Sequence, residues 1–335
     1  FVEVLLLARE LGLLQVGMVS VDGTKVDANA SKHRSVRYDR AKALVEQLRL
    51  DIADLLKQAE RADAQGSNDA QSLPQELRRR EVLAEKLDGA CKRLQAQARK
   101  RAESERAQYE RKLAERETRK GKAKGRKPRI PDESPAGSEQ SNLTDPDSEL
   151  MRKNKRSEYR QSYNAQAVVD AQGSQLVLGA RVSQCASDRN ELVADVEAVP
   201  EAVGKPQSVL ADNGFANEEE VAVLESQNME VLVAIGREGR QRPYDFRPAP
   251  LAKEPKVSLS AWQESMQARM QTAAARAKYQ MRQQTVEPVF GVIKSVLGFR
   301  QFLLRGYDKV QREWQLVCLS YNCKRLHRLK MAMAD

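Results

Sequence analysis

Three acidic residues in an otherwise basic chain have the type and setting for metal chemistry. Asp22 and Asp212 each follow a short apolar stretch typical of a strand, and each has a glycine within two residues that favours a turn. Glu287 lies in a basic helical stretch, with Lys294 seven residues later on the same helical face. Carboxylate oxygens are the ligands that Mg²⁺ and Mn²⁺ prefer. The trio therefore predicts a divalent-cation site that faces a polyanionic substrate.

The strand-end positions give this prediction its geometry. In a sheet covered by helices, ligands bind outside the carboxyl ends of the strands. If the two strands are neighbours, Asp22 and Asp212 can share a cation, and two such ions about 4 Å apart can promote phosphodiester displacement. The alternative is structural: an Asp-Gly turn is common, and Glu287 is also suited to the first turn of a helix capped by Thr285. The order of the three residues on these elements favours the catalytic interpretation.

Composition narrows the class of protein. The chain has 335 residues, enough for one large domain plus an insertion, and its net charge of +10 suits a phosphate-rich partner. Two histidines and four scattered cysteines argue against a zinc site, a disulfide framework and a histidine base. No apolar run could span a membrane and no secretory signal is visible, so we expect a cytoplasmic protein without membrane contact. The start at Phe1, inside an amphipathic helix, indicates a longer parent protein.

Hydrophobic periodicity predicts an α/β fold: a mixed sheet flanked by helices, with a long helical hairpin inserted after the first strand. Residues 1–36 begin the catalytic core, 37–118 form a charged antiparallel helical hairpin, 119–155 form a flexible linker that is first basic and then rich in Pro, Ser and acids, and 156–335 complete the core. The predicted strands are 16–26, 163–170, 175–182, 208–212 and 231–235, and the predicted core helices are 1–13, 190–199, 218–227, 262–296 and 310–329.

Several short motifs recur in the order found in bacterial insertion-sequence transposases of the DDE type. They are Asp22-Gly23-Thr24-Lys25, Ala28-Asn29-Ala30-Ser31-Lys32, 142–148, Tyr163-Asn164-Ala165-Gln166, 211–215, 285–291, 298–300 and 304–306. The chain resembles this family over nearly its whole length outside the charged hairpin, and it resembles the insertion sequence 1182 group in particular. The resemblance implies a ribonuclease-H-like core in which Asp22, Asp212 and Glu287 are the catalytic metal ligands.

The resemblance also implies a function and its partners. The expected activity is metal-dependent phosphodiester cleavage and strand transfer at element ends, with two Mg²⁺ or Mn²⁺ ions, DNA ends and a DNA target, and a homodimer in a synaptic complex. The hairpin is interpreted either as a dimer or synaptic contact or as a passive insertion. Two alternatives stay open: a non-catalytic DNA-binding or scaffolding remnant of a transposase, and a ribonuclease-H-like nuclease without strand transfer.

The family signature around the glutamate is Tyr, two residues, Arg, three residues, Glu, six residues, Lys. Tyr279, Arg282, Glu287 and Lys294 fit it except that Arg282 is one residue too far from Glu287. Five residues turn a helix by about 140° net, so we expect Arg282 to miss the face of Glu287 unless Pro288 kinks the helix or a bulge restores the register.

The expected DNA contacts are Tyr279, Arg282, Lys294 and Lys25, together with Arg126 and Lys127 of the basic run 119–129. The run is equally suited to be a solvated linker, and Lys294 could be a solvated helix lysine. Asp170 and Asp188 are further carboxylates near the sheet, which we interpret as structural. Trp314 lies on an apolar helix face and is predicted to be core.

Overall fold

The structure is a computed structural model that describes residues 1–65, 73–118, 128–154, 156–236 and 259–334. The chain forms two compact units. The first unit combines Phe1–Asn29 with Glu149–Asp335, and the second is Ala30–Ser148. The candidate carboxylates all belong to the first unit.

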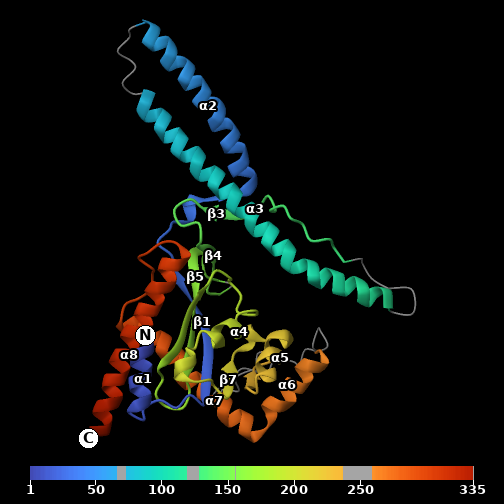
Figure 1. Cartoon of the computed structure of the whole chain (residues 1–335), viewed down its shortest axis with the longest axis vertical. Coiled ribbons are helices and arrows are strands. Elements are labelled where there is room, and N and C mark those ends of the chain that lie inside the picture. Colours follow the sequence, from blue (N-terminus) through green and yellow to red (C-terminus); the bar gives the residue numbers. More distant parts are fainter. Residues whose placement is uncertain (66–72, 119–127, 155, 237–258, 335) are drawn as a thin grey trace, which may run out of the picture. The chain divides into compact units, whose positions relative to one another are not determined.

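The first unit is built on a mixed sheet (Figure 1). Its strands are β1 (Met18–Asp27), β4 (Glu149–Met151), β5 (Arg160–Asp170), β6 (Val177–Ser183), β7 (Ser208–Ala211) and β8 (Glu230–Val233). The strand order is β4-β5-β1-β7-β8, and β6 also pairs with β5. The pairs β4–β5, β5–β6 and β5–β1 are antiparallel, whereas β1, β7 and β8 run parallel. The predicted α/β class with a mixed sheet is confirmed.

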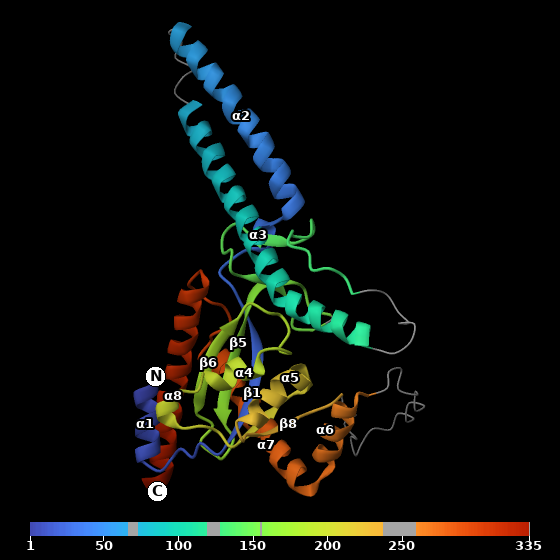
Figure 2. The same cartoon turned by 45° about the vertical axis from the view of Figure 1, so that its right-hand side comes forward.

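Helices cover both faces of this sheet because its central strands are apolar on both sides. They are α1 (Val2–Glu10), α4 (Leu192–Glu197), α5 (Glu218–Ser226), α6 (Ala261–Gln271), α7 (Ala273–Gly291) and α8 (Tyr307–Ala334), with short 3₁₀ turns at Glu201–Val203 and Asn213–Phe215. Val209 and Val231 pack into the main core with α1 and α5, while the alternate residues Leu210 and Leu232 pack against α7. Figure 2 shows α1 beside α8, away from α5 and α6.

One helix was predicted from 262 to 296, but the structure divides this stretch. Thr272 ends α6 with an extended backbone, and its hydroxyl accepts a hydrogen bond from the amide of Ala275 at the start of α7. A π-helical segment, Val292–Val296, follows α7 directly. Trp314 on α8 is fully buried and donates to the carbonyl of Gln166, which confirms its prediction as core.

The second unit contains the predicted helical hairpin. Its elements are a 3₁₀ turn (Lys32–Arg34), β2 (Ser35–Arg37), α2 (Tyr38–Gln65), α3 (Leu73–Thr118) and β3 (Gln140–Asn142), which pairs with β2. Asp51 pairs with Arg80 and Tyr38 with Gln95, so the two helices run antiparallel. Leu48 and Leu87 belong to the buried cluster of this unit.

Part of the predicted flexible linker is ordered. Within 119–155, residues 140–142 form β3 and 149–151 form β4, although this segment is rich in the polar and turn-forming residues that predicted a loop. Asn142 is buried because its side chain caps the following turn, accepting from the amides of Thr144 and Asp145. In the part of the chain that the structure describes, no helix combines the length and apolar character that a membrane crossing needs.

Candidate active site

The first carboxylate, Asp22, lies inside β1 and not at its end. The strand continues to Asp27, paired on one side with β5, while its parallel pairing with β7 stops at Val21 opposite Ala211. The prediction of a turn after Asp22 is therefore wrong. Gly23 is needed for space: a Cβ atom there would lie 2.6 Å from the side-chain amide of Gln166 and 2.7 Å from Asp188 Oδ1.

The second carboxylate, Asp212, follows β7 directly, as predicted. Because Val21 and Ala211 are partners on adjacent parallel strands, Asp22 and Asp212 occupy equivalent next positions at the point where the two strands part. Asp212 Oδ1 accepts a hydrogen bond of 2.7 Å from the amide of Gly214, which caps the 3₁₀ turn that leads away from the sheet. The sheet thus places both aspartates at one opening.

Helix α7 contributes the third carboxylate and the group that links all three. The guanidinium of Arg282 lies 3.0 Å from Asp22 Oδ2, 3.8 Å from Asp212 Oδ2 and 3.9 Å from Glu287 Oε1. The Arg282 side chain is only 9% exposed, whereas that of Glu287 is 60% exposed. The structure therefore brings together the predicted trio, from two strands and one helix, around a buried arginine.

Arg282 does reach Glu287, and a bulge between the two residues does not explain why. The backbone stays α-helical from Arg282 to Glu287, and the π-helical segment comes only after α7 has ended. The reason is side-chain length: Arg282 points toward the sheet, and its long planar fork reaches carboxylates on different elements. Helical position alone did not determine which groups it contacts.

The other two signature residues, Tyr279 and Lys294, contact the strands that carry the aspartates. The hydroxyl of Tyr279 donates to the carbonyl of Ala211 at 3.2 Å, which ties α7 to the last residue of β7. The ammonium of Lys294 contacts the hydroxyl of Thr24 and donates to the carbonyl of Lys25 at 3.2 Å. Lys294 is therefore half-buried against β1 and is not a fully solvated helix lysine. Arg126 and Lys127 lie outside the described residues.

Sequence reasoning assigned Asp188 a structural role, but it lies beside the trio. Its Oδ1 accepts hydrogen bonds from Asn164 (2.6 Å) and Gln166 (2.8 Å), and its Oδ2 lies 3.7 Å from the ammonium of Lys25. The signal for it was present in the sequence. Asn164 and Gln166 lie two residues apart on one face of β5 and are buried, and buried polar side chains require polar partners.

Electrostatics at the site follow from this crowding of acids. The pKa of Asp22 is raised to about 7, mainly by burial; the charges of Asp212 and Asp188 also raise it, while Arg282 and the amide of Gly23 lower it. Burial and nearby carboxylates both favour the protonated form of a carboxyl group, and perturbed groups of this kind are found often at functional sites.

The donor set suits a hard cation in its chemistry. Asp22, Asp212, Glu287 and Asp188 offer oxygen atoms alone, which favours Mg²⁺ or Mn²⁺ over zinc. Among the described residues, however, no three acidic, histidine or cysteine side chains are close enough together to hold one ion as they stand. Arg282 lies between the carboxylates and supplies the positive charge there. The residues fit the cation by ligand type, with Arg282 at the centre of the group.

Comparison with known proteins shows a likeness to a protein family. Neither the curated proteins nor the solved structures contain a match to this chain. Residues 249–327 match the family model described as a transposase DDE domain. The matched segment includes α7, with Arg282 and Glu287, and ends within α8, but it includes neither Asp22 nor Asp212. This match supports a DDE transposase.

Proposed function

We propose that this protein is a metal-dependent DNA transposase that cleaves phosphodiester bonds at element ends and transfers the resulting 3′-hydroxyl to target DNA. The observation that carries the proposal is the convergence of Asp22, Asp212 and Glu287 on Arg282, within 4 Å each, from segments far apart in the sequence. The transposase DDE match at 249–327 supports it independently, because it covers the helix that contributes Glu287.

Each residue has a role in the proposed site. Asp22, Asp212 and Glu287 would hold Mg²⁺ or Mn²⁺, two ions in total, and these ions would supply positive charge to an attacking and a leaving oxygen. Arg282 balances the carboxylates, and Lys294 and Lys25 contact DNA phosphate. The proposal includes a ribonuclease-H-like core, relationship to the insertion sequence 1182 group, and a homodimer that holds two ends.

Substitution of one metal ligand tests the site. Asp212→Asn keeps the size and the hydrogen bond to Gly214 but removes the negative charge. We expect it to abolish Mn²⁺-supported cleavage of a plasmid that carries the sequences flanking the gene, while DNA binding persists. Asp308→Asn, an exposed substitution at the start of α8, is the matched control and is expected to cleave normally. Full cleavage by Asp212→Asn would refute the assignment of Asp212 as a metal ligand.

Strand transfer requires a separate assay because a nuclease with the same carboxylates would pass the first one. Pre-cut flanking DNA with a free 3′-hydroxyl is incubated with a supercoiled target plasmid and Mn²⁺. A transposase joins the two molecules, and Asp212→Asn does not. Cleavage without any joined product would identify a nuclease that lacks strand transfer.

A further inference from the structure

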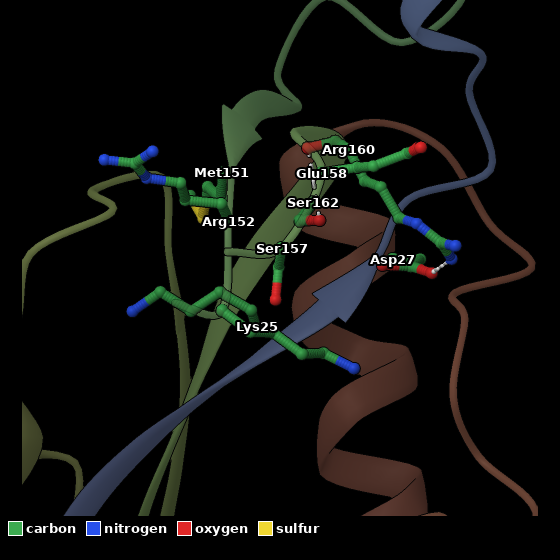
Figure 3. A pocket seen from close by; sticks show the side chains of 9 residues that line it. Lys25, Asp27, Met151, Arg152, Ser157, Glu158, Arg160 and Ser162 are labelled. Carbon is green, nitrogen blue, oxygen red and sulfur yellow. Dashed lines mark hydrogen bonds and ion pairs between the residues drawn. The ribbon is translucent and has the colours of Figure 1, made fainter. Parts of the chain in front are cut away.

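A basic pocket lies next to the acidic site, in the same unit of the chain. Its cavity has a volume of about 260 Å³ and is lined by four cationic side chains, Lys25, Arg152, Lys153 and Arg160, and by two acidic ones, Asp27 and Glu158. Figure 3 shows the pocket, with Arg160 joined to Asp27 and the hydroxyl of Ser157 pointing toward Lys25. Its charge is thus opposite to that of the neighbouring carboxylate site.

Paired strands form part of the pocket wall. Lys25 and Asp27 belong to the second half of β1, which pairs with β5, and Arg160 opens β5 opposite Met151 of β4. The Arg160 guanidinium lies 2.9 Å from Asp27 Oδ2. Arg152 stacks 5.0 Å above the ring of Tyr159. The two strands thus position Lys25, Asp27 and Arg160, whereas Arg152, Lys153, Ser157 and Glu158 lie on the segment between β4 and β5.

Positive charges are crowded around one wall of this pocket. Lys294 contacts the backbone of Lys25 from the other side of β1. Burial lowers the pKa of Lys294 to about 8, and the positive charge of Lys153 is the next largest cause. Lys25 faces Asp188 and Arg160 faces Asp27, but the pocket lining keeps a net positive charge that an anion would balance. The arrangement therefore favours a bound anion.

We propose that this pocket binds a phosphate group of the DNA strand whose scissile phosphodiester lies at the Asp22 site. The proposal rests on the proposed function for its choice of DNA as the anion. Residues rise about 3.3 Å each along a strand, so Lys25 and Asp27 lie roughly 10 to 17 Å from Asp22. With an axial rise of about 3.4 Å per nucleotide, the bound phosphate is a few nucleotides from the cleavage point.

Salt dependence of DNA binding tests the pocket without relying on catalysis. Binding of a fluorescently labelled 30-base-pair duplex is measured by anisotropy in EDTA over a range of salt concentrations. The slope of log K against log salt is negative, and losing one phosphate contact makes it less steep by about 0.9. This change corresponds to roughly eightfold weaker binding near 0.1 M salt. We expect this change for Arg152→Ala combined with Lys153→Ala.

Two controls distinguish the loss of a phosphate contact in the pocket from the effect of a lower net positive charge. Lys205→Ala combined with Arg328→Ala removes the same charge from exposed positions elsewhere in this unit, and we expect a smaller change in slope. Ser157→Asp places a negative charge inside the pocket and should weaken binding, whereas Ser157→Asn should not. Equal slopes for the two double variants, or equal binding by the two Ser157 variants, would overturn the proposal. Because no cleavage is measured, failure of the proposed catalytic activity is seen only in the Asp212→Asn assay.

Discussion

The two halves of β1 carry opposite chemistry. Around Asp22, several carboxylates surround one buried cation, Arg282. Around Asp27, five residues further along the same strand, four cationic side chains surround two acidic ones. The acidic group is largely buried at its centre, whereas Arg160, the partner of Asp27, is well exposed. One strand therefore carries both the proposed cation site and the proposed anion site.

This difference predicts that removing the charge of Arg282 from the acidic group will cost more unfolding free energy than removing the charge of Asp27 from the basic pocket. A charge removed from a buried group leaves its partners unpaired in a poorly solvated place, which costs much free energy. A charge removed from an exposed pair is replaced by water and salt, which costs little. Substitutions at Arg282 and Asp27 thus measure the same kind of loss in two environments.

Arg282→Gln should have the largest effect. It leaves Asp22 and Asp212 without their shared cation, and loss of one partner from a buried charge group costs about 3 kcal/mol of unfolding free energy. Because a divalent cation would replace the missing charge, Mn²⁺ should stabilise this variant more than the wild type. Urea unfolding with and without Mn²⁺ measures both effects.

Arg276→Gln is the matched control for that experiment. It removes the same charge from an exposed position on the same helix, and we expect little change in unfolding free energy. If Arg282→Gln were as stable as Arg276→Gln in EDTA, the acidic group would not depend on Arg282 for its charge balance.

Gly23→Ala tests the packing that separates the two halves of β1. The added methyl would meet the Gln166 amide at 2.6 Å and Asp188 at 2.7 Å, so we expect a loss of about 2 kcal/mol in unfolding free energy. The same change at Gly291, on α7, has nothing within 4 Å and should be neutral or slightly stabilising. Thermal unfolding of both variants checks the contrast, and equal shifts would contradict it.

The pH dependence of metal binding should follow Asp22. Its pKa is raised to about 7, so the folded protein keeps this proton over a range where the unfolded chain has lost it. The stabilisation from this protonated group is therefore present at low pH and is lost as pH rises through about 7. A cation needs the deprotonated form, so its affinity should fall by up to about tenfold per pH unit below 7. Calorimetric Mn²⁺ titration from pH 8 to pH 6 measures this, and a flat profile would exclude Asp22 as the titrating ligand.

The sequence could predict the carboxylates because their local signals are strong. Asp212 follows a buried four-residue strand, and Glu287 lies on a clear helix. Asp22 was identified for a partly wrong reason: Asp-Gly predicts a turn, but pairing with β5 keeps the chain extended through Gly23. Tertiary pairing overrides turn propensity here, and Gly23 leaves room for the side-chain ends of Gln166 and Asp188.

What escaped prediction depends on contacts between distant segments. Asp188 lies outside the regular strands and helices, and only the β1–β5 pairing brings it beside Asp22 through Asn164 and Gln166. Arg282 was misjudged because helical angles locate Cβ atoms, whereas a guanidinium reaches several ångströms further. The strand β4, which lines the basic pocket, has only three residues in a polar stretch, too few to show an alternating pattern.

Asp27→Asn gives the smallest change in stability and an opposite change in binding. The Arg160–Asp27 pair is exposed on its Arg160 side, so its loss should leave the urea unfolding midpoint within error of the wild type. Removing an acid from the pocket raises its net positive charge, so DNA should bind more tightly. The gain in affinity should be smaller than the roughly eightfold change expected for one full phosphate contact. Anisotropy in EDTA measures the gain. Weaker binding by Asp27→Asn would mean that Asp27 positions Arg160 for the phosphate. In both halves of β1, a residue of opposite charge would then orient the groups that bind the ligand.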